Sequence, residues 1–352
     1  MPQLVIRTRS GRVESIHHGY ICVTDSDGKI VYSIGNPQAR IFLRSSGKPI
    51  IANALVKSGA IEKFNLSLKE LAIIASSHEG EAYHRRVIKS IIKKIGASEK
   101  DLGCGHKYPE NQDVQKALIM LGMRPTPIFS NCSGKHVGVL ALCKYYGYPV
   151  EGYTNPGHPV QQLIRNTIAD ILELSTEDIL IGTDGCTMPT YNLSLYQVSY
   201  LYSLLAHGQE HKGKYNDSFE TIKKAMITHP KVIRGKGTFC TDLLNYSKGK
   251  AIGKIGAEGI YCIAIPEKKL GVCIKIFDGH PWSSYPVVVQ VLHELDILDD
   301  EVVKKLDKWA IPAVKDDKGN DVGYLHTAFS LINGETGSFE LGDTYPKEGT
   351  RI

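Results

Sequence analysis

Strand-like and helix-like patterns are unevenly distributed along this chain, and that distribution limits the fold more than any single motif. The first 43 residues and the segments 251–255, 259–265 and 271–277 have strand patterns, whereas residues 50–175 are mainly helical. Further helical patterns occupy about 195–207, 218–228, 284–295 and 300–308. Because strands lie at both ends, we expect an α+β protein in which both chain ends share one largely antiparallel sheet, flanked by helices, with a helical subdomain beside it.

The division of the chain follows from the same distribution. Its 352 residues suffice for one large or two modest domains. No internal repeat, low-complexity segment or clear linker separates the parts. We therefore expect a single catalytic unit, 1–352, of two interleaved parts: a sheet part of about 1–43 and 176–325, and a helical part of about 44–175. The polar, glycine-rich tail 326–352 receives no assignment.

Several local patterns predict individual elements. An Asp27-Gly28 turn between two apolar runs predicts a hairpin, and Gly96 is expected to end the helix that begins near Glu81. Residues 178–182 have the apolar run of a buried strand, and residues 271–277 alternate like a half-buried one. Three histidines are interpreted as surface residues: His84, His207 and His211.

Composition excludes several classes of protein. Apolar residues make up 42% and charged residues 22%, as in soluble globular proteins, and the net charge of +5 is scattered without a long basic run. We therefore expect no nucleic-acid partner. No apolar run approaches the roughly 20 residues that span a bilayer, so no membrane partner is expected either. The eight cysteines show no CxxC and no disulfide framework, and the N-terminus has a strand pattern without a signal peptide; a cytoplasmic location is expected.

Four loops combine small residues with reactive ones, and each follows a predicted strand or helix end. They are residues 44–49, 76–81, 130–138 and 183–187. Glycine permits tight turns and a close approach of the backbone to a ligand. Serine, lysine, histidine, aspartate and cysteine provide nucleophiles, bases and metal ligands. We expect the four loops to form one pocket.

The first loop contains a Ser-x-x-Lys pair, Ser45 and Lys48. Side chains three positions apart on a helical turn lie on the same face. A serine hydroxyl becomes a nucleophile when a neighbouring base takes its proton, and a lysine can act as that base if burial makes its amine neutral. Pro49 confines the motif to the first turn of the helix that follows. By itself the pair also fits a solvated first turn with a capping serine.

Two cysteines, Cys132 and Cys186, lie in the third and fourth loops, 54 positions apart. They fit a zinc site if the loops meet, and otherwise buried core thiols. Lys135 lies one helical turn from Cys132. A lysine binds a metal only as the neutral amine, so its pKa would have to fall by several units.

Taken together, the motifs resemble the L-asparaginase II family of the rhizobial type between about Arg12 and Gly323. The motifs that carry this resemblance are Glu14-Ser15-Ile16-His17, Arg44-Ser45-Ser46-Gly47-Lys48-Pro49, Ser77-His78-Glu79-Gly80-Glu81, Cys104-Gly105-His106, Ser130-Asn131-Cys132-Ser133-Gly134-Lys135-His136, His158-Pro159-Val160-Gln161, Thr183-Asp184-Gly185-Cys186 and Gly256-Ala257-Glu258-Gly259. Their order and spacing are as the family has them.

The resemblance implies a fold similar to serine β-lactamases and glutaminases, a homodimer, and specific site residues. Two Ser-Lys pairs are implied: Ser45 with Lys48, and Ser77 with Lys254, for which Lys275 is the less favoured alternative. One Zn²⁺ per chain is implied, bound by Cys132, Lys135 and Cys186. Substrate-facing or supporting positions fall on Arg44, His136 and Asp184.

The implied reaction, a step of asparagine catabolism, is hydrolysis of L-asparagine to L-aspartate and ammonia. Ser45 would attack after giving its proton to Lys48, and Ser77 with Lys254 would relay protons or hold the true nucleophile. Three alternatives stay open: the same chemistry on another small amide such as glutamine or a β-lactam-like ring, a zinc hydrolase whose serines only position the substrate, and a non-enzymatic binding protein with the same pocket.

Overall fold

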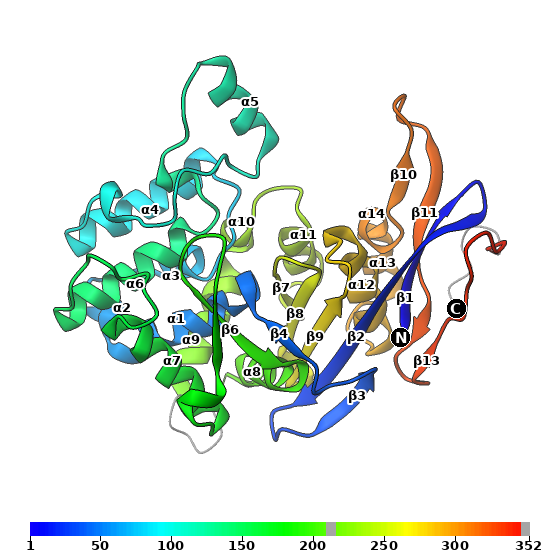
Figure 1. Cartoon of the computed structure of the whole chain (residues 1–352), viewed down its shortest axis with the longest axis horizontal. Helices are drawn as coiled ribbons and strands as arrows, with labels where there is room; N and C mark the ends of the chain where they lie inside the picture. The colour runs from blue at the N-terminus through cyan, green and yellow to red at the C-terminus, as the bar shows by residue number, and fades with distance from the viewer. Residues whose placement is uncertain (209–215, 346–352) are drawn as a thin grey trace. The chain divides into compact units, whose positions relative to one another are not determined.

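The computed structural model describes residues 1–208 and 216–345, and the chain divides into two compact units (Figure 1). The first comprises residues 1–41, 194–206 and 242 onward, and the second comprises 42–193 and 207–241. Compared with the two parts expected from the sequence, residues 176–193 and 207–241 lie with the helical part. The α+β class is confirmed.

The first unit is built on an eight-stranded sheet, whose strands lie side by side in Figure 1. Their order is β10-β11-β1-β2-β9-β8-β7, with β3 paired to β2 as the Asp27-Gly28 turn predicts. The antiparallel pairing of β2 with β9 joins the N-terminal strands to those of residues 251–277, as predicted, and β1 pairs with β11, a strand that the sequence pattern did not predict. The strands are β1 (Gln3–Arg9), β2 (Arg12–Asp25), β3 (Ile30–Ile34), β7 (Ile252–Ile255), β8 (Ile260–Ile265), β9 (Leu270–Ile276), β10 (Ala313–Lys315) and β11 (Asp321–Thr327).

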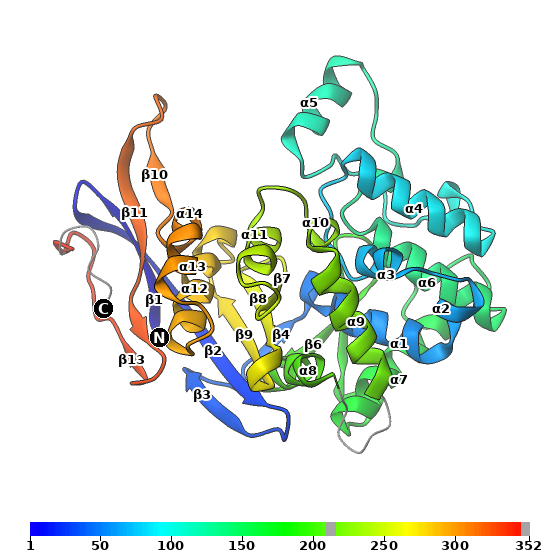
Figure 2. The same cartoon turned by 180° about the vertical axis from the view of Figure 1, so that it is seen from behind.

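Helices cover this sheet, which leaves β9 almost wholly buried. Figure 2 shows α12, α13 and α14 in front of the strands, and α12 contacts β1, β8, β9 and β11. Helix α8 lies so close to β9 that a Cβ on Gly271 would come 2.0 Å from Ser199 O. The prediction of a half-buried strand at 271–277 is therefore wrong: only Lys275 of β9 is partly exposed. These helices are α8 (Leu195–His207), α12 (Ser284–Glu294), α13 (Asp300–Lys305) and α14 (Asp307–Ala310).

The tail, which received no assignment from the sequence, belongs to the first unit as far as Tyr345. It contains the short strands β12 (Phe329–Ser330) and β13 (Glu335–Thr336). Tyr345 packs with Ile6 and Val13, and its N–H donates to Gly11 O. The tail therefore runs back along the β1–β2 hairpin. Residues 346–352 lie outside the described part of the chain.

The second unit is mainly helical, as expected for residues 50–175. Helix α6 is buried on all sides over its first eleven residues, which is typical of a central helix. Helix α1 packs against α6, α7 and α9, and α3 packs against α4, α6 and α9. The helices are α1 (Lys48–Ser58), α2 (Ala60–Lys63), α3 (Leu68–Ile74), α4 (Ala82–Ile95), α5 (Gln112–Met120), α6 (Ser133–Tyr146), α7 (Pro159–Leu172), α9 (Asn216–Thr228), α10 (Pro230–Ile233) and α11 (Phe239–Tyr246), the last of which crosses into the first unit.

A small antiparallel sheet of order β4-β6-β5 completes the second unit. Its strands are β4 (Arg40–Phe42), β5 (Leu180–Thr183) and β6 (Pro189–Ser194). The prediction of a buried strand at 178–182 is wrong, because β5 is an edge strand and Leu180 is 58% exposed. The turn between β5 and β6 carries Asp184 and Cys186.

The histidines expected on the surface behave differently from one another. His84 is fully buried, so its interpretation as a surface residue is wrong. It lies on the buried face of α4 together with Val87, Ile88, Ile91 and Ile95. His207 is half-buried, and His211 lies outside the described residues.

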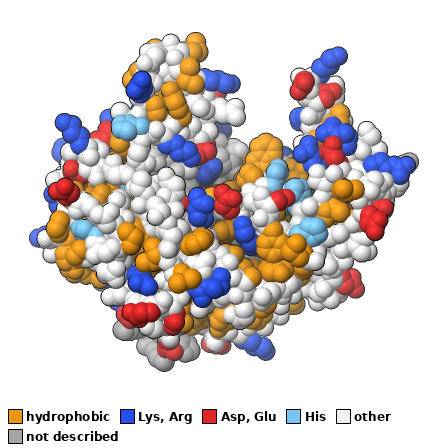
Figure 3. All heavy atoms as spheres, viewed as in Figure 1, with side chains coloured by type: hydrophobic (Ala, Val, Ile, Leu, Met, Phe, Trp, Pro, Cys, Tyr) orange, Lys and Arg blue, Asp and Glu red, His pale blue; other side chains and the backbone are white. Residues whose placement is uncertain are grey.

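Charged and apolar side chains are interspersed on the face seen in Figure 3, without one dominant basic patch. Among the helices of residues 1–208 and 216–345, none combines the length and apolar character needed to span a bilayer.

Candidate active site

Lys48 connects three of the four loops. Residues Arg44–Gly47 form a 3-10 turn, and α1 begins at Lys48 with Pro49 in its first turn. The Lys48 side chain is fully buried. Its Nζ lies 3.1 Å from Ser77 Oγ and donates to Asn131 O at 2.9 Å. A single amine therefore contacts a serine of the second loop and the backbone of the third.

Burial lowers the pKa of Lys48, and the nearby Lys135 cation lowers it further, against the opposing charges of Cys132 and Cys186. A neutral amine has two N–H groups and one lone pair. It can donate to Asn131 O and at the same time accept the proton of the Ser77 hydroxyl. The geometry therefore suits proton transfer from Ser77 to Lys48.

Ser45 does not make the contact that its spacing suggests. Its side chain is half-buried, and no hydrogen bond joins its hydroxyl to a described residue, Lys48 included. The 3-10 turn is the reason: Arg44 adopts φ 49°, and the Ser45 carbonyl accepts the Lys48 N–H. The long lysine side chain points instead to Ser77.

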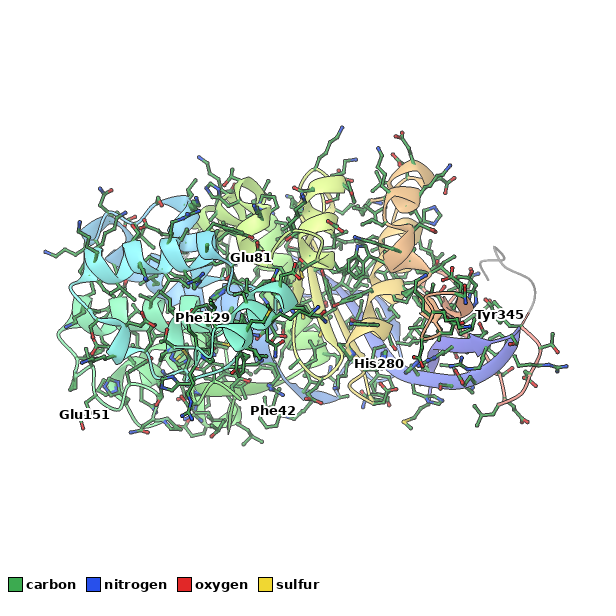
Figure 4. The ribbon with its side chains drawn as sticks, turned by 90° about the horizontal axis from the view of Figure 1, so that it is seen from above. Phe42, Glu81, Phe129, Glu151, His280 and Tyr345 are labelled. Carbon is green, nitrogen blue, oxygen red and sulfur yellow. The ribbon has the colours of Figure 1, made fainter. Side chains whose placement is uncertain are left out.

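The Ser77 loop is fixed by its neighbour His78, which sequence reasoning missed as a site residue. Gly80 N donates to His78 Nδ1, so the proton of the neutral ring is on Nε2, which donates to Ser133 Oγ at 2.9 Å. Burial lowers the pKa of His78 well below its usual value, which keeps the ring neutral. Gly80 of the second loop lies against Phe129, which directly precedes the third loop, because a Cβ on Gly80 would come 3.0 Å from Phe129 O; Figure 4 labels Phe129 and Glu81, the neighbour of Gly80.

A second cluster joins the third and fourth loops. Cys132 Sγ, a carboxylate oxygen of Asp184 and Cys186 Sγ lie within 4.8 Å of one another, and all three residues are buried. Lys135 Nζ lies 3.5 Å from Asp184 Oδ2. Gly134 lets α6 pack closely against α3, because a Cβ there would lie 2.1 Å from Ile73 O.

The charges of this cluster oppose one another. Interaction with the Cys186 side chain holds the pKa of Cys132 well below its usual value, and the same interaction raises the pKa of Cys186, whose Sγ donates to Asp184 Oδ2 at 3.7 Å. Burial works against the ammonium of Lys135, but Cys186, Cys132 and Asp184 raise its pKa. Burial likewise opposes ionisation of Asp184, but Lys135 and Arg44 lower its pKa to about 2.

The donor set fits a zinc ion. Two buried thiols in reach of each other, with either a lysine amine or a carboxylate as a third ligand, are ligands that Zn²⁺ accepts. Lys135 would have to lose its proton to bind, whereas Asp184 is already ionised. These residues could therefore hold a metal.

Arg44 and Asp184 form an ion pair, with Arg44 Nε donating to Asp184 Oδ1 at 2.8 Å. The strained φ of Arg44 is held by its N–H, which donates to Thr190 Oγ1. The pair brings a cation and an anion, each partly desolvated, to one place in the second unit.

His136 lies in the first turns of α6. Its Nδ1 lies 2.6 Å from the hydroxyl of Tyr153, which accepts from Gly103 N, and its buried Nε2 has no partner among the described residues. In the tautomer in which the Tyr153 hydroxyl donates to Nδ1, Nε2 is an N–H donor. Tyr153 gave no signal in the sequence, because it lies outside every motif.

Two further lysines belong to the first unit. Lys254, in β7, is fully buried and donates to Ile255 O at 2.8 Å. Lys275, in β9, donates to Glu258 O. The pairing of either lysine with Ser77, a residue of the second unit, stays a prediction.

Comparison with known proteins identifies the family. The L-asparaginase II family model matches residues 5–327, and no curated protein matches the chain. Three similar solved structures are a protein assigned as a β-lactamase from Bacteroides dorei (13% identity, TM-score 0.43, 74% of this chain and 85% of that one), a β-lactamase from Mycobacterium bovis (11%, 0.44, 80% and 95%) and a Bacillus glutaminase (12%, 0.36, 79% and 91%).

The family match covers all the motifs of the second unit described above, from Arg44 to Cys186, and reaches the end of β11. It does not depend on the distant solved structures. From the match over residues 5–327, the chain belongs to the L-asparaginase II family of amidohydrolases.

Proposed function

We propose that this protein hydrolyses L-asparagine to L-aspartate and ammonia through a serine nucleophile activated by Lys48. The observation that carries the proposal is the buried contact between Lys48 Nζ and Ser77 Oγ at 3.1 Å. The family supplies the reaction class. A lysine whose pKa is lowered by burial, placed beside a serine hydroxyl, supplies the chemistry.

In the first step, the Ser77 hydroxyl gives its proton to neutral Lys48 and Oγ bonds to the side-chain amide carbon. The tetrahedral adduct collapses when the C–N bond breaks, and the Lys48 ammonium protonates the leaving nitrogen, so that ammonia departs. Water then attacks the β-aspartyl ester, gives its proton to Lys48, and releases aspartate as Ser77 regains a proton. The Lys48 contact favours Ser77 over Ser45 as nucleophile, which revises the sequence-based expectation.

Substrate recognition is assigned to Arg44, Asp184 and His136. The α-carboxylate and α-ammonium of asparagine carry opposite charges and match the Arg44–Asp184 pair, whose members are 2.8 Å apart. The buried Nε2–H of His136 provides a donor to a substrate oxygen. An amino-acid zwitterion is therefore the ligand whose charges fit this site.

A zinc ion is part of the proposal, bound by Cys132, Cys186 and Lys135, with Asp184 as the alternative third ligand. When bound, zinc supplies a Lewis acid and a link between the third and fourth loops. The residues themselves hold the two loops together and orient Asp184.

Two further expectations derive from the family resemblance alone: Lys254 would relay protons to Ser77, and the enzyme would be a homodimer. The cysteine pattern of the sequence adds a third, a cytoplasmic location. All eight cysteines are free thiols, which supports a reducing compartment. Light scattering of the purified protein tests the dimer.

The deciding measurement is ammonia release from L-asparagine and, in parallel, from L-glutamine by the purified protein. Release from asparagine, at a rate well above that from glutamine, supports the proposal. Release from glutamine alone would move the assignment to the alternative amide, and no release from either would contradict it and favour the non-enzymatic binding protein. The same assays after treatment with a chelator show whether the metal is needed for turnover.

The rival zinc-hydrolase mechanism makes a different prediction. If the serines only position the substrate, a Ser45→Ala/Ser77→Ala double variant keeps much of the wild-type rate. The serine mechanism predicts a loss of about 10⁴-fold or more in that variant. A matched Ser58→Ala variant, at the end of α1, controls for a general effect of removing a hydroxyl.

A further inference from the structure

We infer that Arg234, a residue outside every motif of the sequence, is a positioning residue that holds Ser77 in place for proton transfer to Lys48. The inference rests on the proposed function and adds a residue to it. Arg234 follows α10 and is separated from Ser77 by 157 positions, yet its side chain reaches the backbone of the nucleophile itself.

The contact is a fork. Arg234 Nη1 donates to Ser77 O at 3.2 Å, and Arg234 Nε pairs with Glu79 Oε1 at 2.8 Å. One guanidinium therefore bridges the carbonyl of Ser77 and the carboxylate two residues later. Both side chains are largely buried, with 20% of Arg234 and 10% of Glu79 exposed, so neither partner is well screened by water.

The backbone adds two bonds at the same place. Ser77 N donates to Ile233 O at 3.0 Å and Glu79 N donates to Arg234 O at 2.9 Å. The segment 233–234 is thus aligned along residues 77–79 like a short paired strand. The chain continues through Gly235, which has φ 153°. Glycine is required there because a Cβ would lie 2.7 Å from Glu79 Cγ.

On the other side, Ser77 Oγ faces Lys48, and His78 is bonded to Ser133. Ser77 therefore lies between the lysine that takes its proton and the guanidinium that fixes its carbonyl. Misplacing a reacting group by about 1 Å costs on the order of 100-fold in rate, so a backbone held by this fork matters to catalysis. A lysine at position 234 has a single point donor and cannot bond both partners in the same way.

The test compares Arg234→Ala, Arg234→Lys and Glu79→Gln with the wild type by steady-state ammonia release. We expect Arg234→Ala and Arg234→Lys to lower kcat by about 100-fold while KM changes less than about threefold, because the substrate contacts are untouched. Glu79→Gln keeps an oxygen acceptor for Nε and should lose less, about tenfold. Millimolar guanidinium, far below denaturing concentrations, should restore part of the activity that Arg234→Ala loses. It should leave the rates of the wild type and of Arg234→Lys unchanged.

The matched control is Lys94→Ala. Lys94 likewise bridges a buried glutamate and a backbone carbonyl, Glu70 at 2.6 Å and Asn65 O at 2.7 Å, but at the end of α4. Its loss should lower the free energy of unfolding without changing kcat.

The outcomes separate this inference from the proposed function. If the wild type releases ammonia and Arg234→Ala loses no more activity than Lys94→Ala, or guanidinium gives no rescue of a folded Arg234→Ala, the positioning role is wrong and the asparaginase reaction stands. If the wild type releases no ammonia, the proposed function fails first. If Arg234→Ala does not fold, the test is the kcat of Glu79→Gln, which should fall about tenfold while KM stays unchanged. A Glu79→Gln enzyme with the kcat of the wild type would overturn the inference.

Discussion

Lys48 Nζ lies 3.1 Å from Ser77 Oγ although 29 positions separate the two residues, whereas the hydroxyl of Ser45, three positions away, makes no hydrogen bond to the Lys48 amine. The base of this site therefore comes from the start of α1 and the hydroxyl comes from the loop after α3. Four predictions follow the consequences of that arrangement and of the charges around it.

Replacing the base tests the dyad directly. We expect Lys48→Met to lower kcat by about 10²–10⁴-fold, the usual contribution of a general base. The free energy of unfolding should stay unchanged or rise, because an apolar side chain replaces an amine that is fully buried. Ammonia release and urea unfolding measure the two effects. Lys57→Met, at the exposed end of the same helix, is the control. A Lys48→Met enzyme within tenfold of the wild type would rule out the base.

Arg44 should control substrate affinity more than turnover. A charge-assisted hydrogen bond contributes about 1.5–3 kcal/mol, so Arg44→Gln should raise KM about 10–100-fold with a smaller change in kcat. The effect should vanish for an asparagine derivative whose α-carboxylate is an amide, because that group no longer needs the guanidinium. Arg86→Gln, on the exposed face of α4, is the matched control. An unchanged KM in Arg44→Gln would place the carboxylate elsewhere.

The number of protons released when zinc binds should show whether Lys135 or Asp184 is the third ligand. A lysine amine coordinates only after losing a proton, whereas an aspartate coordinates as it stands. Wild-type protein should therefore release about one proton more per zinc than Lys135→Met, measured by calorimetry in buffers of different ionisation enthalpy. Cys132→Ser and Cys186→Ser should lose zinc, and Cys143→Ser, a buried thiol of α6, should keep it. Equal proton release in wild type and Lys135→Met would favour Asp184 as the ligand.

His84 should make the protein less stable in mild acid. Burial lowers its pKa from 6.5 to about 3, while its Nε2 donates to Lys231 O. The unfolded chain then binds the proton more readily than the folded one. The contribution is complete above pH 6.5 and is lost as the pH falls toward 3, with a slope of about 1.4 kcal/mol per pH unit in that window.

The check is urea unfolding of wild type and His84→Gln between pH 4 and 6. Glutamine keeps an N–H donor but does not titrate there, so the slope should fall by about 1.4 kcal/mol per pH unit. The exposed His106→Gln should leave the slope unchanged. A variant with the slope of the wild type would show that His84 is not the titrating group.

Features that depend on nearby residues could be predicted from the sequence. Gly96 ends α4 with φ 64°, and the turn at Gly28 joins β2 to β3, because a local backbone conformation demands these residues. The sequence also predicted that strands from both ends of the chain share one sheet, because strand patterns occur at both ends. The L-asparaginase II family followed from motifs whose spacing is written in the chain.

Features that depend on distant packing could not be predicted. The Ser45–Lys48 spacing suggested a dyad on one helical face, but the 3-10 turn at Arg44 directs Lys48 toward Ser77. Arg234 and Tyr153 contact site residues from segments without motifs, so their role depends on tertiary structure alone. The place of Tyr345 in the fold could not be predicted, because it lies outside any strand or helix pattern. It packs through its aromatic ring, against Ile6 and Val13.

The pairing of β1 with β11 also sets an order of assembly during translation. The second unit is complete once residue 241 has left the ribosome, whereas the sheet of the first unit lacks β11 until residue 327 has been made. At about 5–20 residues per second, several seconds separate the two events. The part of the chain that holds Lys48, Ser77 and Arg234 is then free to fold while β1 and β2 still wait for their last partners.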